Sequence, residues 1–318
     1  MEIINFTDEH IDQVINLAKH NYENERKFVP ALPPVKTWPD ISGFVKNGLG
    51  VVAIDGDKVL GYLCCVTPFK NAFHSTDAVG VFSPMHCNGS ISENREVIYS
   101  RMYQSAAEKW VKTKASSHAI CLYAHDTVAQ NLFFHNGFGM RCMDAIRPME
   151  EITLYGCPGY TFEELHYTDY NLVYPLYSLL GEHMAESPCF IVRSHSMETF
   201  SKSIRNDSRF FVAKRCNEIV AFLKIVNSGE TFITEANDLR YVDGAFCLPE
   251  HRGRQIYPNL LNYAIGKLKV EGYKYLGVDF ESINPTAYHF WPKYFNVYTH
   301  SVVRRIDEHS LKQKIVII

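Results

Sequence analysis

The chain contains an internal repeat, and this repeat limits the folds that it can adopt. Two segments, VVAIDGDKVLGYLCC and FFVAKRCNEIVAFLKIV, each place two apolar runs around a short polar turn, which predicts a β-hairpin. Ala53 and Gly61 of the first segment align with Ala213 and Ala221 of the second, an offset of 160 in a chain of 318 residues. A repeat of this length predicts two copies of one supersecondary plan.

The elements around each hairpin recur in the same order. Each half begins with a short strand and a helix, expected at residues 2–6, 9–19, 162–166 and 170–183. After the hairpin come a strand ending in proline (GVFSP, GAFCLP), a long amphipathic helix, a buried strand (HAICLYAH, YKYLGVDFE) and a short aromatic helix (DTVAQNLFFHNGF, NPTAYHFWPKYF). We therefore predict two α/β domains, residues 1–150 and 160–318, joined by a segment interrupted by proline and glycine.

Composition and charge exclude several classes of protein. Lys+Arg (32) and Asp+Glu (35) nearly balance, so the net charge of −3 argues against a nucleic-acid partner. No apolar run reaches the length of a membrane span, and the acidic N-terminus MEIINFTDEH is unlike a signal peptide. The nine cysteines show no CxxC spacing and the 14 histidines no HxxxH or HExxH spacing. We expect free thiols, a cytoplasmic location, no membrane partner and no metal.

The segment LPEHRGRQIYPNLL joins the end of a predicted strand to the start of the second long helix. A glycine-containing loop at a helix N-terminus presents backbone N–H groups and partial positive charge, which favour a phosphate group. Arg252 and Arg254 add full charges that suit a pyrophosphate. A basic turn that only caps the helix is the alternative.

This segment resembles the acyl-CoA-binding loop of the GNAT acetyltransferases, whose pattern is Q/R-x-x-G-x-G/A. Arg252 fits the first position, whereas Gln255 and Tyr257 stand at the two glycine positions, and Gly253 lies one place inside the pattern. A second family pattern, N-x-x-A-x-x-L-Y, usually followed four residues later by Gly-Phe, is also present in both halves. It is matched, with substitutions, by Asn284, Ala287, Phe290 and Trp291 in the C-terminal half and by Asp126, Ala129, Leu132, Phe133, Gly137 and Phe138 in the N-terminal half.

The resemblance implies a fold, a cofactor and a reaction. It implies α/β (α+β) tandem GNAT folds, each with a mixed, mostly antiparallel sheet flanked by helices, an architecture similar to that of the mycothiol synthases. It further implies an N-acetyltransferase that moves an acetyl group from acetyl-CoA to an amine of a small molecule or peptide, as a monomer or homodimer. The cofactor-binding residues that it implies are Phe246, Cys247, Leu248, Arg252, Gly253, Arg254, Gln255, Ile256, Tyr257, Asn284 and Trp291.

The two halves differ at the position of the phosphate loop. After GVFSP, the N-terminal half reads MHCNGSISEN, which holds one glycine, Gly89, and no Lys or Arg. Phosphate would meet backbone dipoles there without a full positive charge. We therefore predict that the N-terminal domain has no cofactor and that the C-terminal domain is the active one.

Catalysis in this family requires a base for the amine and an acid for the leaving thiolate. By position, the candidate bases are Asp243, Glu235 and Glu281, and each is also a plausible solvated carboxylate at a strand end. Because Trp291 has no acidic O–H, the candidate acids are Tyr288 and Tyr294. Pro292 is expected to kink or end the helix between them.

Four further hypotheses remain open at the level of sequence. The strand at residues 242–248 is expected to splay from its neighbour and to offer backbone N–H groups to the thioester. Cys247 could carry an acyl group, although a buried thiol is the simpler interpretation. A non-catalytic CoA- or ligand-binding protein is the alternative function, and a sheet-edge interaction through the apolar segment KIVII is a third.

Overall fold

The computed structural model describes residues 1–311, which divide into two compact units. The first unit comprises Met1–Pro30, Pro34–Met143 and residues 297–311, and the second comprises Ala31–Pro33 and Asp144–Asn296. The predicted domains, 1–150 and 160–318, remain a prediction. The compact units differ from them by grouping residues 297–311 with the first unit and residues 31–33 and 144–150 with the second. The segment KIVII lies outside the described residues.

Strands of the first unit form two groups. The first group is antiparallel, in the order β1 (Glu2–Asn5), β2 (Val51–Asp55), β3 (Lys58–Leu63) and β5 (Asn88–Ser90). The second has the order β4 (Gly80–Ser83), β6 (Ser117–Tyr123), β14 (Thr299–Arg305) and the start of β7 (Gly139–Pro148). Only β4 and β6 are parallel among these pairs; β14 pairs with all seven residues of β6.

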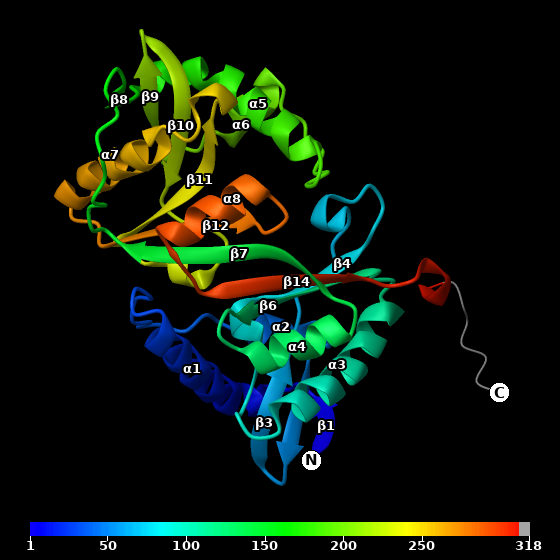
Figure 1. The fold of residues 1–318 in the computed structure, drawn as a ribbon. Helices are drawn as coiled ribbons and strands as arrows, with labels where there is room; N and C mark the ends of the chain where they lie inside the picture. Colours follow the sequence, from blue (N-terminus) through cyan, green and yellow to red (C-terminus); the bar gives the residue numbers. More distant parts are fainter. Residues whose placement is uncertain (312–318) are drawn as a thin grey trace. The chain divides into compact units, whose positions relative to one another are not determined.

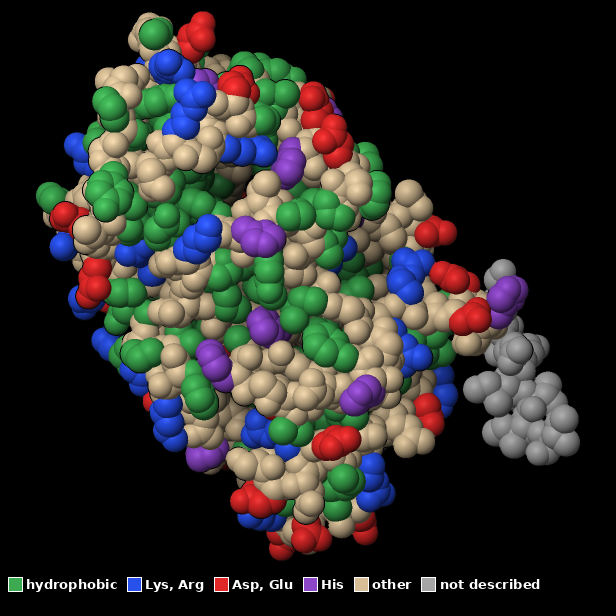
Figure 2. Space-filling view, viewed as in Figure 1, with side chains coloured by type: hydrophobic (Ala, Val, Ile, Leu, Met, Phe, Trp, Pro, Cys, Tyr) green, Lys and Arg blue, Asp and Glu red, His purple; other side chains and the backbone are tan. Residues whose placement is uncertain are grey.

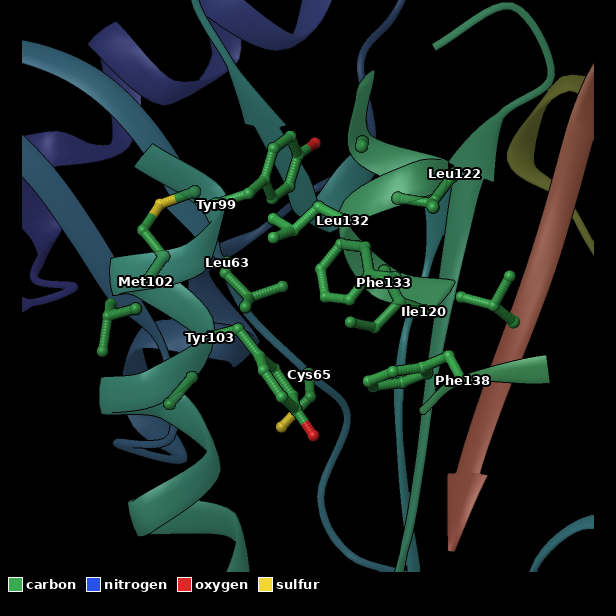
Figure 3. Packing of buried hydrophobic residues seen from close by; sticks show 14 of the residues in the cluster. Leu63, Cys65, Tyr99, Met102, Tyr103, Ile120, Leu122, Leu132, Phe133 and Phe138 are labelled. Carbon is green, nitrogen blue, oxygen red and sulfur yellow. The ribbon is translucent and has the colours of Figure 1, made fainter. Parts of the chain in front are cut away.

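The helices of the first unit are α1 (Ile11–Phe28), α2 (Ser42–Lys46), α3 (Arg95–Lys112) and α4 (Thr127–His135). The helix expected at 9–19 is therefore longer than predicted. Side chains from α3, α4 and β6 meet in the core shown in Figure 3. Tyr103 packs edge-on against Phe133 and Phe138, with ring centroids 5.6 and 5.2 Å apart. Such pairs add about 0.5–1.5 kcal/mol each beyond area burial.

The second unit is built on one twisted sheet (Figure 1). Its strands run in the order β8 (Thr161–Glu164), β9 (Arg209–Arg215), β10 (Glu218–Val226), β11 (Leu239–Cys247) and β12 (Tyr275–Glu281). Neighbours are antiparallel except β11 and β12, which are parallel. The helices are α5 (Tyr174–Ala185), α6 (Met197–Ser203), α7 (Ile256–Val270) and α8 (Pro285–Phe290). A two-residue strand, β13 (Asn296–Val297), follows α8 in the chain and pairs with β7.

The helices of the second unit cover both faces of this sheet. Phe210 and Phe222 share a buried cluster with Phe200 of α6 and residues of α5. Phe211 points to the other face, because successive strand residues alternate, and there it meets Tyr263 of α7 at 6.4 Å between ring centroids. Each unit thus has the predicted fold class, a mixed, mostly antiparallel sheet flanked by helices.

The predicted repeat is present in the hairpins. Ala53 pairs with Gly61 across β2–β3, and Ala213 pairs with Ala221 across β9–β10. In both hairpins the register then shifts by one residue, at position 60 in the first and 220 in the second, again 160 apart. A bulge of this kind bends a hairpin and increases its twist, so both copies curve at the same point.

Two local predictions can be compared with the helices. The helix expected at 170–183 consists of a 3-10 helix, Tyr167–Val173, followed by α5. The prediction that Pro292 ends its helix is confirmed, because α8 stops at Phe290 and a 3-10 turn, Trp291–Lys293, follows.

Candidate active site

The parallel pair β11–β12 separates before either strand ends. Their register runs from Leu239↔Tyr275 to Val242↔Val278 and stops there, although β11 continues to Cys247. β12 continues to Glu281. An open wedge therefore lies between the last residues of the two strands, as expected for residues 242–248.

One edge of β11 directs free backbone donors into this wedge. Leu248 N–H donates to Val220 O of β10 at 3.0 Å. Because N–H directions alternate along an extended strand, Phe246 N–H also points toward β10, whereas Cys247 and Ala245 N–H point toward the wedge. Of Phe246, Cys247 and Leu248, which we predict to contact the cofactor, only Cys247 has its N–H on that side.

A bulge in β11 lies next to these donors. The register with β10 shifts between Leu223 and Ile225, so that Asp243 and Gly244 both stand opposite Lys224. Gly244 has φ +140°, which a residue with a side chain rarely adopts. Lys224 Nζ pairs with Asp243 Oδ2 at 2.8 Å and also donates to Ser203 O.

The loop between β11 and α7 has the geometry of an anion site. Gly253 has φ +73° and Gln255 has φ +62°, so the chain turns sharply before α7 begins at Ile256. The first N–H groups of α7 therefore point outward without a side-chain cap. The positive φ of Gln255 explains why glycine suits this position in the family pattern.

A pocket of about 390 Å³, which we call the loop pocket, lies between this loop and α8. Its lining includes nine of the predicted cofactor-binding residues: Phe246, Cys247, Arg252, Gly253, Gln255, Ile256, Tyr257, Asn284 and Trp291. Leu248 and the exposed Arg254 are not among its lining residues. Arg252 folds back on β11, where its Nε donates to Cys247 O at 3.0 Å and its guanidinium lies over the Phe246 ring.

A second pocket of about 560 Å³ lies at the other side of the wedge, and we call it the strand-end pocket. It is lined by the ends of β11 and β12, by α5 and by the segment at residues 193–205. The two pockets adjoin, since they share Leu180, Ala245, Asn284, Ala287 and Trp291. Both pockets belong to the second unit.

Three family-pattern residues line both pockets, namely Asn284, Ala287 and Trp291. Asn284 caps α8: its Oδ1 accepts hydrogen bonds from Thr286 N and Ala287 N, and His183 Nε2 lies 3.3 Å from the same oxygen. Trp291 is 5% exposed, and its ring packs 6.1 Å from that of Tyr257. Asn284 therefore holds α8 in position where a ligand contact was predicted.

The candidate catalytic residues are dispersed. Asp243 and Glu281 line the strand-end pocket, and Tyr294 lines the loop pocket, where burial raises its pKa. Tyr288, which is 47% exposed, lines neither pocket. Glu235 is also exposed and lines neither pocket. Asp243 and Glu281 each have a cationic neighbour, Lys224 and Arg193 respectively.

Sequence reasoning missed Asp279, which stands directly after the last paired residue of β12. It lines the strand-end pocket, and its Oδ1 accepts a hydrogen bond from Tyr241 Oη at 2.9 Å. Burial, followed by the charges of Asp144 and Glu230, raises the pKa of Asp279 to about 8. A carboxylate with such a pKa is a stronger base than an ordinary one. The only signal in the sequence is the alternation of side chains along a strand, which places Asp279 and Glu281 on one face.

Cys247 lines the loop pocket as a buried thiol. Burial raises its pKa to about 11, which keeps it protonated at neutral pH and disfavours its use as a nucleophile. Within residues 1–311, no group of three or more His, Cys, Asp or Glu side chains is arranged to hold a metal ion. No helix of the described chain is long and apolar enough to cross a bilayer.

The first unit fills the corresponding place with its own residues. After β4, the chain forms β5 on the edge of β3, and the amide of Asn88 donates to Cys121 O of β6 at 2.9 Å. α3 begins after Asn94, which has φ +54° and corresponds to Gln255. Arg95 then pairs with Asp126 at 2.6 Å, and its guanidinium also donates to Ser90 O. Its charge is thereby engaged within the unit.

Comparisons with known proteins agree with this geometry. Residues 175–296 match the family described as "Acetyltransferase (GNAT) family". The fold resembles a GCN5-related N-acetyltransferase from Sphaerobacter thermophilus at 13% identity, covering 95% of each chain with a TM-score of 0.57. It also resembles a GCN5-related glucosamine N-acetyltransferase region of a fungal multi-domain β-N-acetylglucosaminidase at 14% identity and TM-score 0.50, covering 95% of this chain and 38% of that one. No curated protein sequence matches.

Proposed function

Because residues 175–296 form a domain of the GNAT acetyltransferase family, we propose that the second unit is an acetyl-CoA-dependent N-acetyltransferase that acts on a small-molecule or peptide amine. The observation that carries this proposal is the meeting of two pockets at the open wedge of β11 and β12. A donor and an acceptor that enter from opposite sides would bring their reacting atoms together there, which removes much of the entropic barrier.

The loop pocket suits the acyl donor. The N-terminus of α7 and the turn at Gly253 favour the pyrophosphate, and Arg252 adds a charge at the pocket wall. The wedge donors, Cys247 N–H and Ala245 N–H, would then polarise the thioester oxygen.

Asp279 and Tyr294 would handle the protons. Asp279 lines the acceptor side and can take a proton from the incoming ammonium group, after which the free amine can attack. Tyr294 lines the donor side and can give its phenol proton to the departing thiolate. Each residue is thus matched to the side on which its proton transfer is needed.

We propose that the first unit binds no donor and serves as a scaffold. The Asn88 amide and the Arg95 guanidinium, which a phosphate would need, are instead engaged by Cys121 O and Asp126 within the unit. That the protein is a monomer or homodimer without nucleic-acid or membrane partners remains a prediction. Its location in the cytoplasm also remains a prediction. On the face drawn in Figure 2, the basic and acidic side chains of the described residues are interspersed rather than gathered into a broad basic patch.

Calorimetry with acetyl-CoA tests the donor site. We expect Arg252→Ala to weaken binding by about tenfold, since a hydrogen bond to a charged group contributes about 1.5–3 kcal/mol. Arg254→Ala removes the same charge outside the pocket lining and should change affinity by less than about threefold. An equal loss of affinity in both variants would show that the phosphate site lies outside the loop pocket.

Thiol release with a panel of amines tests the reaction. The expected result is amine-dependent release of CoA that falls strongly in Asp279→Asn. Binding of acetyl-CoA without release for any amine would instead support the alternative, a non-catalytic CoA-binding protein. That alternative draws on Gln255 and Trp291, which replace the glycine and tyrosine of the family pattern.

A further inference from the structure

Each Lys or Arg side chain that lines the strand-end pocket already has an acidic partner. These pairs are Lys224–Asp243 at 2.8 Å, Lys202–Glu198 at 2.6 Å, Arg205–Asp207 at 3.0 Å and Arg193–Glu281 at 3.9 Å. The charge of Arg193 acts on Glu230 as well. His195 also lines the pocket, and its Nδ1 lies 3.2 Å from Arg193 O. The pocket therefore has no surplus of positive charge to offer an anionic ligand.

Asp279 is the carboxylate of this pocket that lacks a cationic partner. Its Oδ1 accepts a hydrogen bond from the neutral hydroxyl of Tyr241 at 2.9 Å, and within residues 1–311 no Lys, Arg or His lies in ion-pair range of it. The neighbouring charges that act on it are those of Asp144, Glu230 and Asp243, which are all negative. An ammonium group that enters the pocket would supply the missing positive charge, whereas an anion beside Asp279 would be repelled.

An acceptor with a carboxylate next to its amine would meet further like charges. Glu281 follows Asp279 by two residues, so it lies on the same face of β12, roughly 6.6 Å along the strand. Lys224 is only 7% exposed and donates to both Asp243 and Ser203 O, so its ammonium group is already satisfied. The surroundings of Asp279 therefore favour a ligand that carries a positive charge alone.

Helix α5 presents an apolar stripe to the same pocket. Tyr177, Leu180, Gly181 and Met184 line it, and their spacing of three, four and seven residues places them on one face of the helix. All four are half-buried, so part of their surface is open to a ligand. The indole of Trp291 lines the pocket as well. A hydrocarbon or aromatic group that covers this stripe would be removed from water together with it.

We propose that the acceptor is a primary amine with an apolar group and no acidic group, whose ammonium binds Asp279 and whose apolar group lies along α5. This inference rests on the proposed function. In the reaction, Asp279 takes one proton from the ammonium group, the nitrogen bonds to the thioester carbonyl carbon and the C–S bond breaks. A second nitrogen proton goes to the thiolate, which leaves as a thiol, and Asp279 returns its proton to solvent. The product is a neutral amide, which no longer offers Asp279 a cation and can leave.

The first test compares two acceptors of similar size in the intact chain. In phenylalaninol, a neutral hydroxymethyl group replaces the carboxylate of phenylalanine, while the ammonium group and the ring are kept. We expect wild-type kcat/KM to favour phenylalaninol by about 10- to 100-fold, because the carboxylate of phenylalanine would face like charges. Equal or better use of phenylalanine would overturn the inference.

Glu281→Gln removes one of the carboxylates that would repel phenylalanine. It should reduce the preference for phenylalaninol by about threefold or more. Glu218→Gln is the matched control, because it makes the same change at the exposed start of β10, outside both pockets. It should leave the preference within about twofold of the wild-type value. Equal preferences in both variants would contradict the role given to the pocket's carboxylates, and thermal unfolding checks that each variant is folded.

The second test measures binding without reaction. Calorimetry with phenethylamine on the chain saturated with CoA, which carries no acetyl group, should show binding that Asp279→Asn weakens by about tenfold or more. Ethylamine, which lacks the ring, should bind the wild type at least about tenfold more weakly than phenethylamine.

Two results of this binding test would overturn the inference. Unchanged phenethylamine binding in Asp279→Asn would remove the ammonium site, and equal binding of ethylamine would remove the apolar site along α5. Amine binding that depends on Asp279, without acetylation of any amine, would contradict the proposed function alone. The two failures are therefore distinguishable.

Discussion

Tyr241 donates a hydrogen bond from its hydroxyl to Asp279 Oδ1 at 2.9 Å, across the last paired residues of β11 and β12. The ring reaches this place because it lies against two glycines. A Cβ at Gly277 would be 2.7 Å from the ring, and one at Gly229 would overlap it. Tyr241 is therefore a positioning residue for the carboxylate that we assign as the base.

The first prediction concerns the pH dependence of the reaction. Because the pKa of Asp279 is raised to about 8, kcat/KM should rise with pH and level off above about pH 8. The groups that face Asp279 are Tyr241, Asp144, Glu230 and Asp243. An acceptor whose ammonium group has a pKa of about 10 or more stays charged over this range, which keeps the amine's own titration out of the profile.

Tyr241→Phe provides the control for this profile. In the wild type, the hydrogen bond from Tyr241 favours the ionised form of Asp279, so the variant that lacks this bond should have its midpoint at higher pH. A purely structural role of Tyr241 would lower the rate without moving the midpoint. An unshifted profile in both Tyr241→Phe and Asp279→Asn would exclude Asp279 as the base.

The second prediction concerns stability. The pKa of Asp279 is about 8 in the folded chain against 3.8 for an ordinary aspartate, so the folded state binds more protons between these values. The free energy of unfolding therefore falls as pH rises from about 4 to 8. Asp279→Asn should be more stable than the wild type at pH 8 by at least about 1 kcal/mol, since one pKa unit corresponds to about 1.4 kcal/mol.

Urea unfolding at pH 5 and pH 8 measures this difference. The gain of Asp279→Asn over the wild type should be smaller at pH 5, where the ionisation penalty has developed only in part. A variant that is less stable than the wild type at pH 8 would mean that the carboxylate is stabilised in its ionised form, contrary to its burial.

Tyr241 and Asp279 show where prediction from the sequence ends. The repeat and both hairpins follow from local apolar patterns, and Ala53–Gly61 and Ala213–Ala221 pair as aligned. The end of the β11–β12 ladder at Val278 depends on tertiary packing, so the sequence does not indicate that Asp279 opens onto a pocket. The same holds for Asn284, whose role as a cap on α8 depends on where the helix begins.

The third prediction concerns Gln255, whose φ of +62° is costly for a residue with a side chain. Gln255→Gly should leave the affinity for acetyl-CoA equal or higher, because glycine adopts this conformation freely and opens the loop pocket. Gly253→Ala, at φ +73°, is the matched opposite change and should weaken binding. Calorimetry measures both, and a tenfold loss in Gln255→Gly would mean that the glutamine side chain contacts the donor.

The fourth prediction concerns β14, which pairs with β6 and with the start of β7 in the first unit. Deletion of residues 299–318 leaves the seven residues of β6 without their antiparallel partner and removes Val302, a fully buried member of the first unit's core. We expect this truncation to unfold at a lower temperature than a control that lacks only residues 312–318. Hydrogen exchange at residues 117–123 should be faster as well.

Val302→Ala tests the same role should the truncated chain fail to fold. Loss of two buried methyl groups should cost about 1–3 kcal/mol in the free energy of unfolding. Acetyl-CoA should still bind this variant, because the loop pocket draws its lining from residues 180–294 of the second unit. If the truncated chain unfolds at the same temperature as the control and hydrogen exchange in β6 is unchanged, β14 does not stabilise the first unit.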